Sequence, residues 1–169
     1  MRLDIDPGMG RLGVPSERAH DDELSPVLSL HTRIPFLKNV PPGAALGYGR
    51  SFVTARDSVI ATLPIGYEDG YPRSLSNQAS VIVRGCRQRV VGEISMDFTL
   101  VDVTDVTGVQ EGDDVVLHGE SDGDCVSIYD LAETCGTIAH EFFGGLSPRV
   151  PRIAQGHGLA NERATARGR

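Results

Sequence analysis

The sequence predicts a mainly β fold: an antiparallel, barrel-like domain with one or two short helices near its C-terminal end. Three observations favour this class. The chain of 169 residues holds 20 glycines and 10 prolines, so turns are frequent. Apolar and polar residues alternate over several short segments, as in half-buried strands. Helix-capping signals occur only after residue 126. Short strands joined by tight turns are typical of a barrel or a sandwich.

The strands are expected in a regular series. A short strand, residues 3–5, leads into a glycine-rich loop, and residues 14–23 form a polar linker. One long alternating strand covers residues 27–40 and ends at the turn VPPG. Further strands follow at 58–65, at 80–85 and 87–95, at 98–103 and at 114–119; the middle two form a hairpin around Gly85.

The helices are expected late in the chain. Ser127 stands three residues before Asp130, which resembles a capping box, and Gly136 is placed to end that helix. A second short helix covers residues 138–144. The two prolines of residues 147–153 predict an extended segment. The polar residues 156–169 are expected to form a flexible tail.

Charge and composition exclude several classes of function. The net charge is −7 and the isoelectric point is near 5.1, which argues against nucleic acid as a partner. No apolar run reaches the ~18 residues of a membrane helix, and the N-terminus lacks the apolar core of a signal peptide, so we expect a cytoplasmic protein. The three scattered cysteines form no CxxC pair, and no metal site is expected.

The loop LPIGYEDGYPR, residues 63–73, carries the first candidate for chemistry. A tyrosine with a pKa near ~10 becomes a useful acid/base group when a cation stabilises its phenolate. Arg73 is the nearest cation in sequence, and Gly66 and Gly70 permit a tight loop that fixes the hydroxyl of Tyr67. The alternative is a turn tyrosine that packs its ring and leaves its hydroxyl in water.

This loop belongs to a series of motifs that occur in a fixed order. They are PIGYEDGYPR, VGEISMDFTLVDVTD, EGDDVVLHG and LAETCGTIAHEFFGGLSPRVPR. Over residues 24–155 the series resembles the C-terminal β domain of alanine racemase, a pyridoxal-phosphate enzyme that interconverts L- and D-alanine. The resemblance implies an isomerase that supplies D-alanine for the cell wall and acts as a homodimer.

The resemblance also implies roles for individual residues. Tyr67 matches the catalytic tyrosine, which exchanges a proton with the α-carbon of the substrate. Met96 matches a methionine that contacts the substrate, with Asp97 beside it. In the family these residues reach across a head-to-tail dimer into the partner's cofactor site. His140 stands where the family has a tyrosine that binds the cofactor phosphate; packing on the short helix is its alternative role.

The N-terminal residues 1–23 resemble a remnant of the family's barrel followed by a linker. IDPGMGRLGV matches a barrel segment in which Arg11 would contact the cofactor and the substrate carboxylate; its alternative is an exposed arginine in a glycine-rich arm. The short spacing to the β domain indicates an internal deletion or a fragment. The family's second acid/base group is a lysine on a barrel that needs about 200 residues.

The lysine in this chain is Lys38, expected to be solvated on its strand. We therefore expect that the isolated chain neither binds pyridoxal phosphate covalently nor racemises alanine. Two alternatives stay open: a non-catalytic module that dimerises with or regulates a barrel-bearing racemase, and a decayed fragment with exposed apolar surface.

Overall fold

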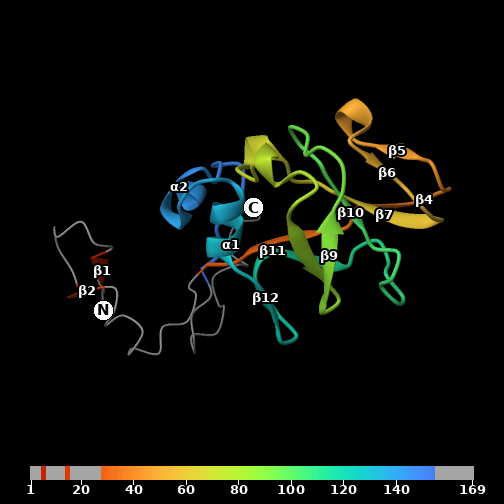
Figure 1. Ribbon diagram of the computed structural model, residues 1–169. Helices are drawn as coiled ribbons and strands as arrows, with labels where there is room; N and C mark the ends of the chain where they lie inside the picture. The colour runs from red at the N-terminus through yellow and green to blue at the C-terminus, as the bar shows by residue number, and fades with distance from the viewer. Residues whose placement is uncertain (1–4, 7–13, 16–27, 155–169) are drawn as a thin grey trace, which may run out of the picture.

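The computed structural model describes residues 5–6, 14–15 and 28–154, and its main body is an eight-stranded sheet (Figure 1). Every strand pair in this sheet is antiparallel. In spatial order the path runs β12 (Asp124–Val126), β11 (Asp114–Ser121), β8 (Ser80–Val83), β9 (Cys86–Val90), β10 (Thr99–Asp102), β7 (Ser58–Leu63) and β4 (Phe36–Val40), while β3 (Leu30–Arg33) pairs with β11.

The sheet must curl back on itself, because two strands that are consecutive in sequence lie near its two opposite ends. β3 lies beside β11 near one end and β4 forms the other, yet only Ile34 and Pro35 separate them. Ile34 is fully buried, and its amide donates to the Asp113 carbonyl at 3.0 Å. The predicted barrel-like fold is confirmed. The single strand predicted over residues 27–40 is wrong, since Pro35 has no amide for a sheet hydrogen bond and divides it.

The inside of the curled sheet is the hydrophobic core. Alternate residues of the central strands point inward, which gives the period of two seen in the sequence. Burying each such side chain contributes about 1.5–3 kcal/mol. The fully buried members on these strands and just beyond them are Ala61, Leu63, Val81, Val83, Val101, Val103, Val115 and Leu117.

The two predicted α-helices are confirmed, and both lie at one end of the sheet (Figure 1). They are α1 (Ile128–Thr134) and α2 (Ala139–Gly144). The Ser127 hydroxyl accepts from the Tyr129 amide at 3.1 Å, so Ser127 is the N-cap. Among the described residues Asp130 makes no return bond to the Ser127 amide, so the cap is simpler than the predicted capping box. Gly136 has φ 69° and its amide donates to the Glu133 carbonyl at 2.9 Å, which ends α1 as expected.

Several small elements were not predicted. β5 (Ala45–Leu46) and β6 (Phe52–Val53) form a two-stranded ribbon on the side of the sheet away from the helices (Figure 1). Between them lies the 3-10 turn η1 (Tyr48–Arg50), and further single turns are η2 (Tyr67–Asp69) and η3 (Arg73–Leu75). β12 was also missed. Residues 147–150 form a turn rather than the extended segment predicted, closed by the Val150 amide on the Ser147 carbonyl.

The N-terminal strands β1 (Ile5–Asp6) and β2 (Val14–Pro15) pair in parallel, separately from the main sheet. Most of the predicted strand at 3–5, the linker and the tail 156–169 lie outside the described residues.

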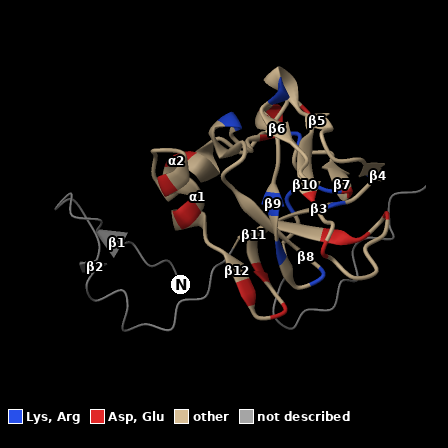
Figure 2. Ribbon diagram, turned by 45° about the vertical axis from the view of Figure 1, so that its right-hand side comes forward, with Lys and Arg blue, Asp and Glu red and all other residues tan. Residues whose placement is uncertain are grey.

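Acidic and basic positions are interspersed over the described ribbon (Figure 2). Exposed ion pairs join neighbouring strands and hairpins: Arg33 with Asp114 at 2.8 Å, Arg84 with Asp113 at 3.2 Å and Arg87 with Asp124 at 2.7 Å. Such exposed pairs contribute little individually. Across residues 28–154 and the two short N-terminal strands, none of the helices has the length and hydropathy to cross a membrane.

Candidate functional site

The loop after β7 folds into a tight turn around Tyr67. The amides of Asp69 and Tyr71 both donate to the Gly66 carbonyl at 3.1 Å. Gly70 takes φ 94°, a left-handed conformation that suits glycine, and its amide donates to the Tyr67 carbonyl at 3.2 Å. This turn leaves 43% of Tyr67 exposed and buries Tyr71 completely.

A second turn, residues 95–98, carries Met96. The Ser95 amide donates to the Phe98 carbonyl at 2.9 Å, and the Phe98 amide donates to the Ser95 hydroxyl at 3.0 Å. These bonds close the turn and leave half of the Met96 surface exposed. Met96 is therefore presented outward from a fixed backbone.

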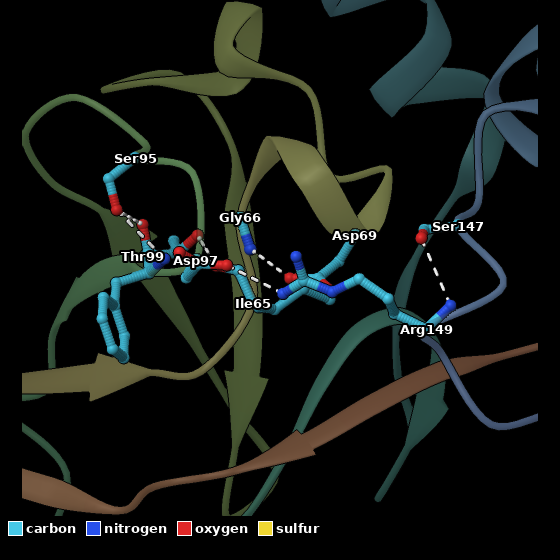
Figure 3. Close-up of polar contacts among 9 residues, drawn as sticks. Ile65, Gly66, Asp69, Ser95, Asp97, Thr99, Ser147 and Arg149 are labelled. Atoms are coloured by element: carbon cyan, nitrogen blue, oxygen red, sulfur yellow. Dashed lines mark hydrogen bonds and ion pairs between the residues drawn. The ribbon is translucent and has the colours of Figure 1, made fainter.

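The two turns contact each other through their backbones. The amides of Tyr67 and Glu68 donate to the carbonyls of Ser95 and Met96, each at 3.1 Å. A Cβ on Gly66 would lie 2.3 Å from the Ser95 oxygen, so only glycine permits this approach. The buried Thr99 hydroxyl adds a bond of 2.7 Å to the Ile65 carbonyl (Figure 3). The structure thus brings together two of the residues that the sequence singled out.

Tyr67 and Met96 share the wall of one open hollow of about 760 Å³. Its lining consists of Tyr48, Tyr67, Arg73, Ile94, Ser95 and Met96. A second hollow adjoins it across Tyr48 and Ser95 and adds the apolar side chains of Phe98 and Leu100. The site is a phenol-rich and apolar surface rather than an enclosed cavity.

Tyr48 is a site residue that the sequence analysis missed. It lies in η1, where Gly47, Gly49 and Arg50 all have positive φ, and 71% of its surface is exposed. Arg50 is the member of this group that is not glycine, and such residues in a left-handed conformation are common at functional sites. The signal in the sequence was a tyrosine between two glycines shortly after a turn, in ALGYGRS.

Arg73 is less available than the sequence suggested. It lines the hollow, but its Nε lies 3.1 Å from a carboxylate oxygen of Glu93. The carboxylate of Glu93 offsets much of the positive charge of Arg73. Arg73 is therefore a weaker electrostatic partner for the nearby tyrosine hydroxyl groups.

The other predicted site residues lie elsewhere. His140 is exposed on α2 and does not line the hollow. Lys38 is exposed on the edge strand β4. Arg11 lies outside the described residues. Among the residues that the structure describes, no group of three or more His, Cys, Asp or Glu could hold a metal ion.

Comparisons with known proteins identify the family of the chain. The alanine racemase C-terminal domain family matches residues 27–154. Alanine racemase from Halothermothrix orenii is 47% identical over 150 residues, 88% of this chain and 40% of that protein. Alanine racemase 2 from Caldanaerobacter subterraneus subsp. tengcongensis is 48% identical over 131 residues, 78% of this chain and 34% of that protein.

The solved structures that this chain resembles are also alanine racemases. Alanine racemase from Bacillus anthracis with bound L-Ala-P has a TM-score of 0.77 at 33% identity, over 88% of this chain and 38% of that one. Alanine racemase from Bartonella henselae with covalently bound pyridoxal phosphate has a TM-score of 0.69 at 36% identity, over 74% and 34% of the two chains. This chain therefore spans well under half the length of the relatives it matches. The shared sequence and fold show that the chain belongs to the alanine racemase family, with its C-terminal domain at residues 27–154.

Proposed function

We propose that this chain supplies the phenol-bearing face of a pyridoxal-phosphate-dependent alanine racemase, which interconverts L- and D-alanine. The observation that carries the proposal is the meeting of Tyr67 and Met96 at one open hollow. Exchange of the α-proton of an amino acid needs an acid/base group fixed within reach of that carbon. A phenol held by two cross-bonded turns meets the requirement for fixed position.

Two tyrosines compete for this role. Tyr67 is the residue that the resemblance assigns, and its backbone is bonded to the turn that carries Met96. Tyr48 lines the same hollow, is more exposed and lies in a turn rich in positive φ. The geometry supports one of them as the proton donor and acceptor and the other as a wall of the substrate site.

The residues around the hollow do not make a complete cofactor site. When bound, pyridoxal phosphate takes up the electrons left by the departing proton. Its covalent attachment requires an amine, and the lining offers hydroxyl groups, a thioether and the paired Arg73. Lys38 is exposed on β4, apart from this lining. We therefore assign the amine to another polypeptide segment.

The partner that fits this face is a racemase chain that carries a lysine-bearing barrel. The exposed apolar side chains Tyr48, Tyr67, Met96 and Phe98 gather around the two adjoining hollows. Apolar side chains gathered in this way mark surfaces that a partner covers. Such a complex would act in the cytoplasm.

A complementation experiment tests the proposal. The alanine racemase of Halothermothrix orenii would be made with phenylalanine at its own positions that align with Tyr48 and Tyr67, then mixed with this chain. We expect a mixed dimer by light scattering and restored racemisation. Tyr67→Phe or Tyr48→Phe in this chain should abolish restoration, which identifies the acid/base group. Tyr129→Phe is the matched control, because Tyr129 is an exposed phenol on α1.

The outcomes separate the alternatives. Association without restored activity would support a non-catalytic module. No association at high micromolar concentration, together with aggregation of the chain alone, would support a decayed fragment. Turnover of L-alanine by this chain alone, with an aldimine absorbance lost in Lys38→Arg, would show that the assignment of the amine to another segment is wrong.

A further inference from the structure

The side chain of Arg149 contacts both turns of the site. Its Nη2 donates to the Asp97 carboxylate at 2.7 Å, and its Nε lies 3.3 Å from the Asp69 carboxylate. Asp69 belongs to η2, which begins at Tyr67, and Asp97 follows Met96 in the sequence. Figure 3 shows the side chains of Asp69 and Asp97 beside the Arg149 guanidinium. One guanidinium therefore contacts both turns, which are 28 residues apart in sequence (97 − 69).

Asp69 needs this partner because it is nearly buried, with 8% of its surface exposed. Its second carboxylate oxygen accepts from the Gly66 amide at 3.0 Å, inside the turn that places Tyr67. A buried carboxylate without a cation would be costly in free energy. The charge of Arg149 thus supports the internal hydrogen bond of the turn.

The segment that carries Arg149 is itself held against the site. The Ser147 amide donates to the Asp69 carbonyl at 3.1 Å. The Arg152 guanidinium donates to the carbonyls of Leu146, Ser147 and Val150, each at 2.9 Å. These bonds fix the backbone around Arg149, so its side chain starts from a defined position.

Arg149 does not line the hollow, so it reaches the substrate surface only through the two turns. Two of its nitrogens are engaged by carboxylates. The hydrogen bond to Asp97 raises the pKa of Arg149, with a further contribution from the charge of Asp69. Arg149 therefore binds these two carboxylates and is not positioned to bind a ligand in the hollow.

We propose that Arg149 is a positioning residue that holds the Tyr67 turn and the Met96 turn in fixed positions relative to each other, so that both face the substrate. As a statement about catalysis this rests on the proposed function; as a statement about the order of the two turns it does not. Lysine at this position carries the charge but lacks the planar fork that reaches two acids at once.

Amide hydrogen exchange on the full chain directly tests whether Arg149 keeps the two turns ordered. We expect Arg149→Gln to speed exchange at Tyr67 and Glu68 by about tenfold, with strands β8 and β11 unchanged. Arg149→Lys should be intermediate. Arg33→Gln, which breaks an exposed Arg–Asp pair on β3, is the matched control and should leave both turns unchanged. Unchanged exchange in Arg149→Gln, or an equal increase across the whole sheet, would overturn the proposal.

A second variant keeps the test decisive if Arg149→Gln does not fold. Asp97→Asn removes only the exposed half of the bridge, and it should speed exchange at the amide of Phe98 while Gly66 stays protected. Equal exchange at Phe98 in this variant and the wild type would overturn the proposal.

The complementation assay then separates the two claims. If the wild-type chain restores racemisation, Arg149→Gln should lower kcat more than it raises KM, because misplaced turns weaken the transition state most. If the wild-type chain restores nothing while the exchange results hold, the proposed function fails and the positioning role stands.

Discussion

Tyr67 and Tyr71 lie four residues apart on one loop and face opposite environments. Tyr67 is 43% exposed beside the hollow, whereas Tyr71 is fully buried and its hydroxyl has no hydrogen-bond partner within the described protein. Burial raises the pKa of Tyr71 well above its ordinary value of 10.0. The loop therefore uses one tyrosine as a surface group and the other as an anchor.

The buried phenol predicts a loss of stability at high pH. A folded-state pKa above the unfolded one means that only the unfolded state releases the proton as pH rises past ~10. The free energy of unfolding should then fall by about 1.4 kcal/mol per pH unit from this group. Urea unfolding under reducing conditions at pH 8 and at pH 11 should show a smaller loss for Tyr71→Phe.

At neutral pH Tyr71→Phe should be neutral or slightly stabilising, because it removes an unpartnered buried hydroxyl. Tyr67→Phe is the control, and its pH dependence should follow the wild type. Identical pH dependence in all three proteins would contradict the assignment.

The close approach of the two site turns predicts that Gly66→Ala is strongly destabilising. The new Cβ would lie 2.3 Å from the Ser95 carbonyl oxygen and 2.4 Å from that of Met96, and backbone cannot move aside cheaply. We expect a loss of about 2 kcal/mol or more in urea unfolding. Gly144→Ala, a helix position with open space around its Cβ, should cost nothing.

The cap of α1 predicts a moderate effect. Ser127→Ala removes the acceptor for the Tyr129 amide and should lower the free energy of unfolding by about 1 kcal/mol. Ser74→Ala, at an exposed serine of η3, provides the comparison and should be neutral within error. Equal midpoints for the two variants would show that the cap is unimportant.

The Arg87–Asp124 pair predicts a small acid sensitivity. The hydrogen bond from Arg87, with help from the Cys125 amide, lowers the pKa of Asp124. A lowered carboxylate pKa gives stability above the unfolded value, which is lost as the pH falls towards the folded one. Between pH 5 and pH 3 the wild type should lose more stability than Arg87→Gln. Arg89→Gln, on the same strand, controls for the change in net charge.

The sequence predicted those features that depend on neighbours along the chain. The 80–90 hairpin turns at Gly85, and α1 runs from Ser127 to Gly136, because turn and cap residues act locally. Alternation alone did not reveal the break at Pro35, since the pattern of apolar residues continues through it. The different burial of Tyr67 and Tyr71 also has no local signal.

The site was predictable in part. Resemblance singled out Tyr67 and Met96, which the structure places at one hollow, but it missed Tyr48 and the bridge made by Arg149. Tyr48 lines the hollow because the backbone of Gly47 packs closely against that of Glu93, and Arg149 contacts the two site turns from the turn at residues 147–150. Both contacts are long-range, so they depend on the closure of the fold.

The pairing of β3 with β11 delays the completion of the sheet while the chain is being synthesised. Arg33 meets Asp114, 81 residues later, so an emerging β3 finds no partner until the ribosome has added that length. At roughly 5–20 residues per second this delay is on the order of 4–16 s. Through that interval we expect β3 to remain unpaired and accessible to chaperones and proteases, and refolding in the test tube should be slow for the same reason.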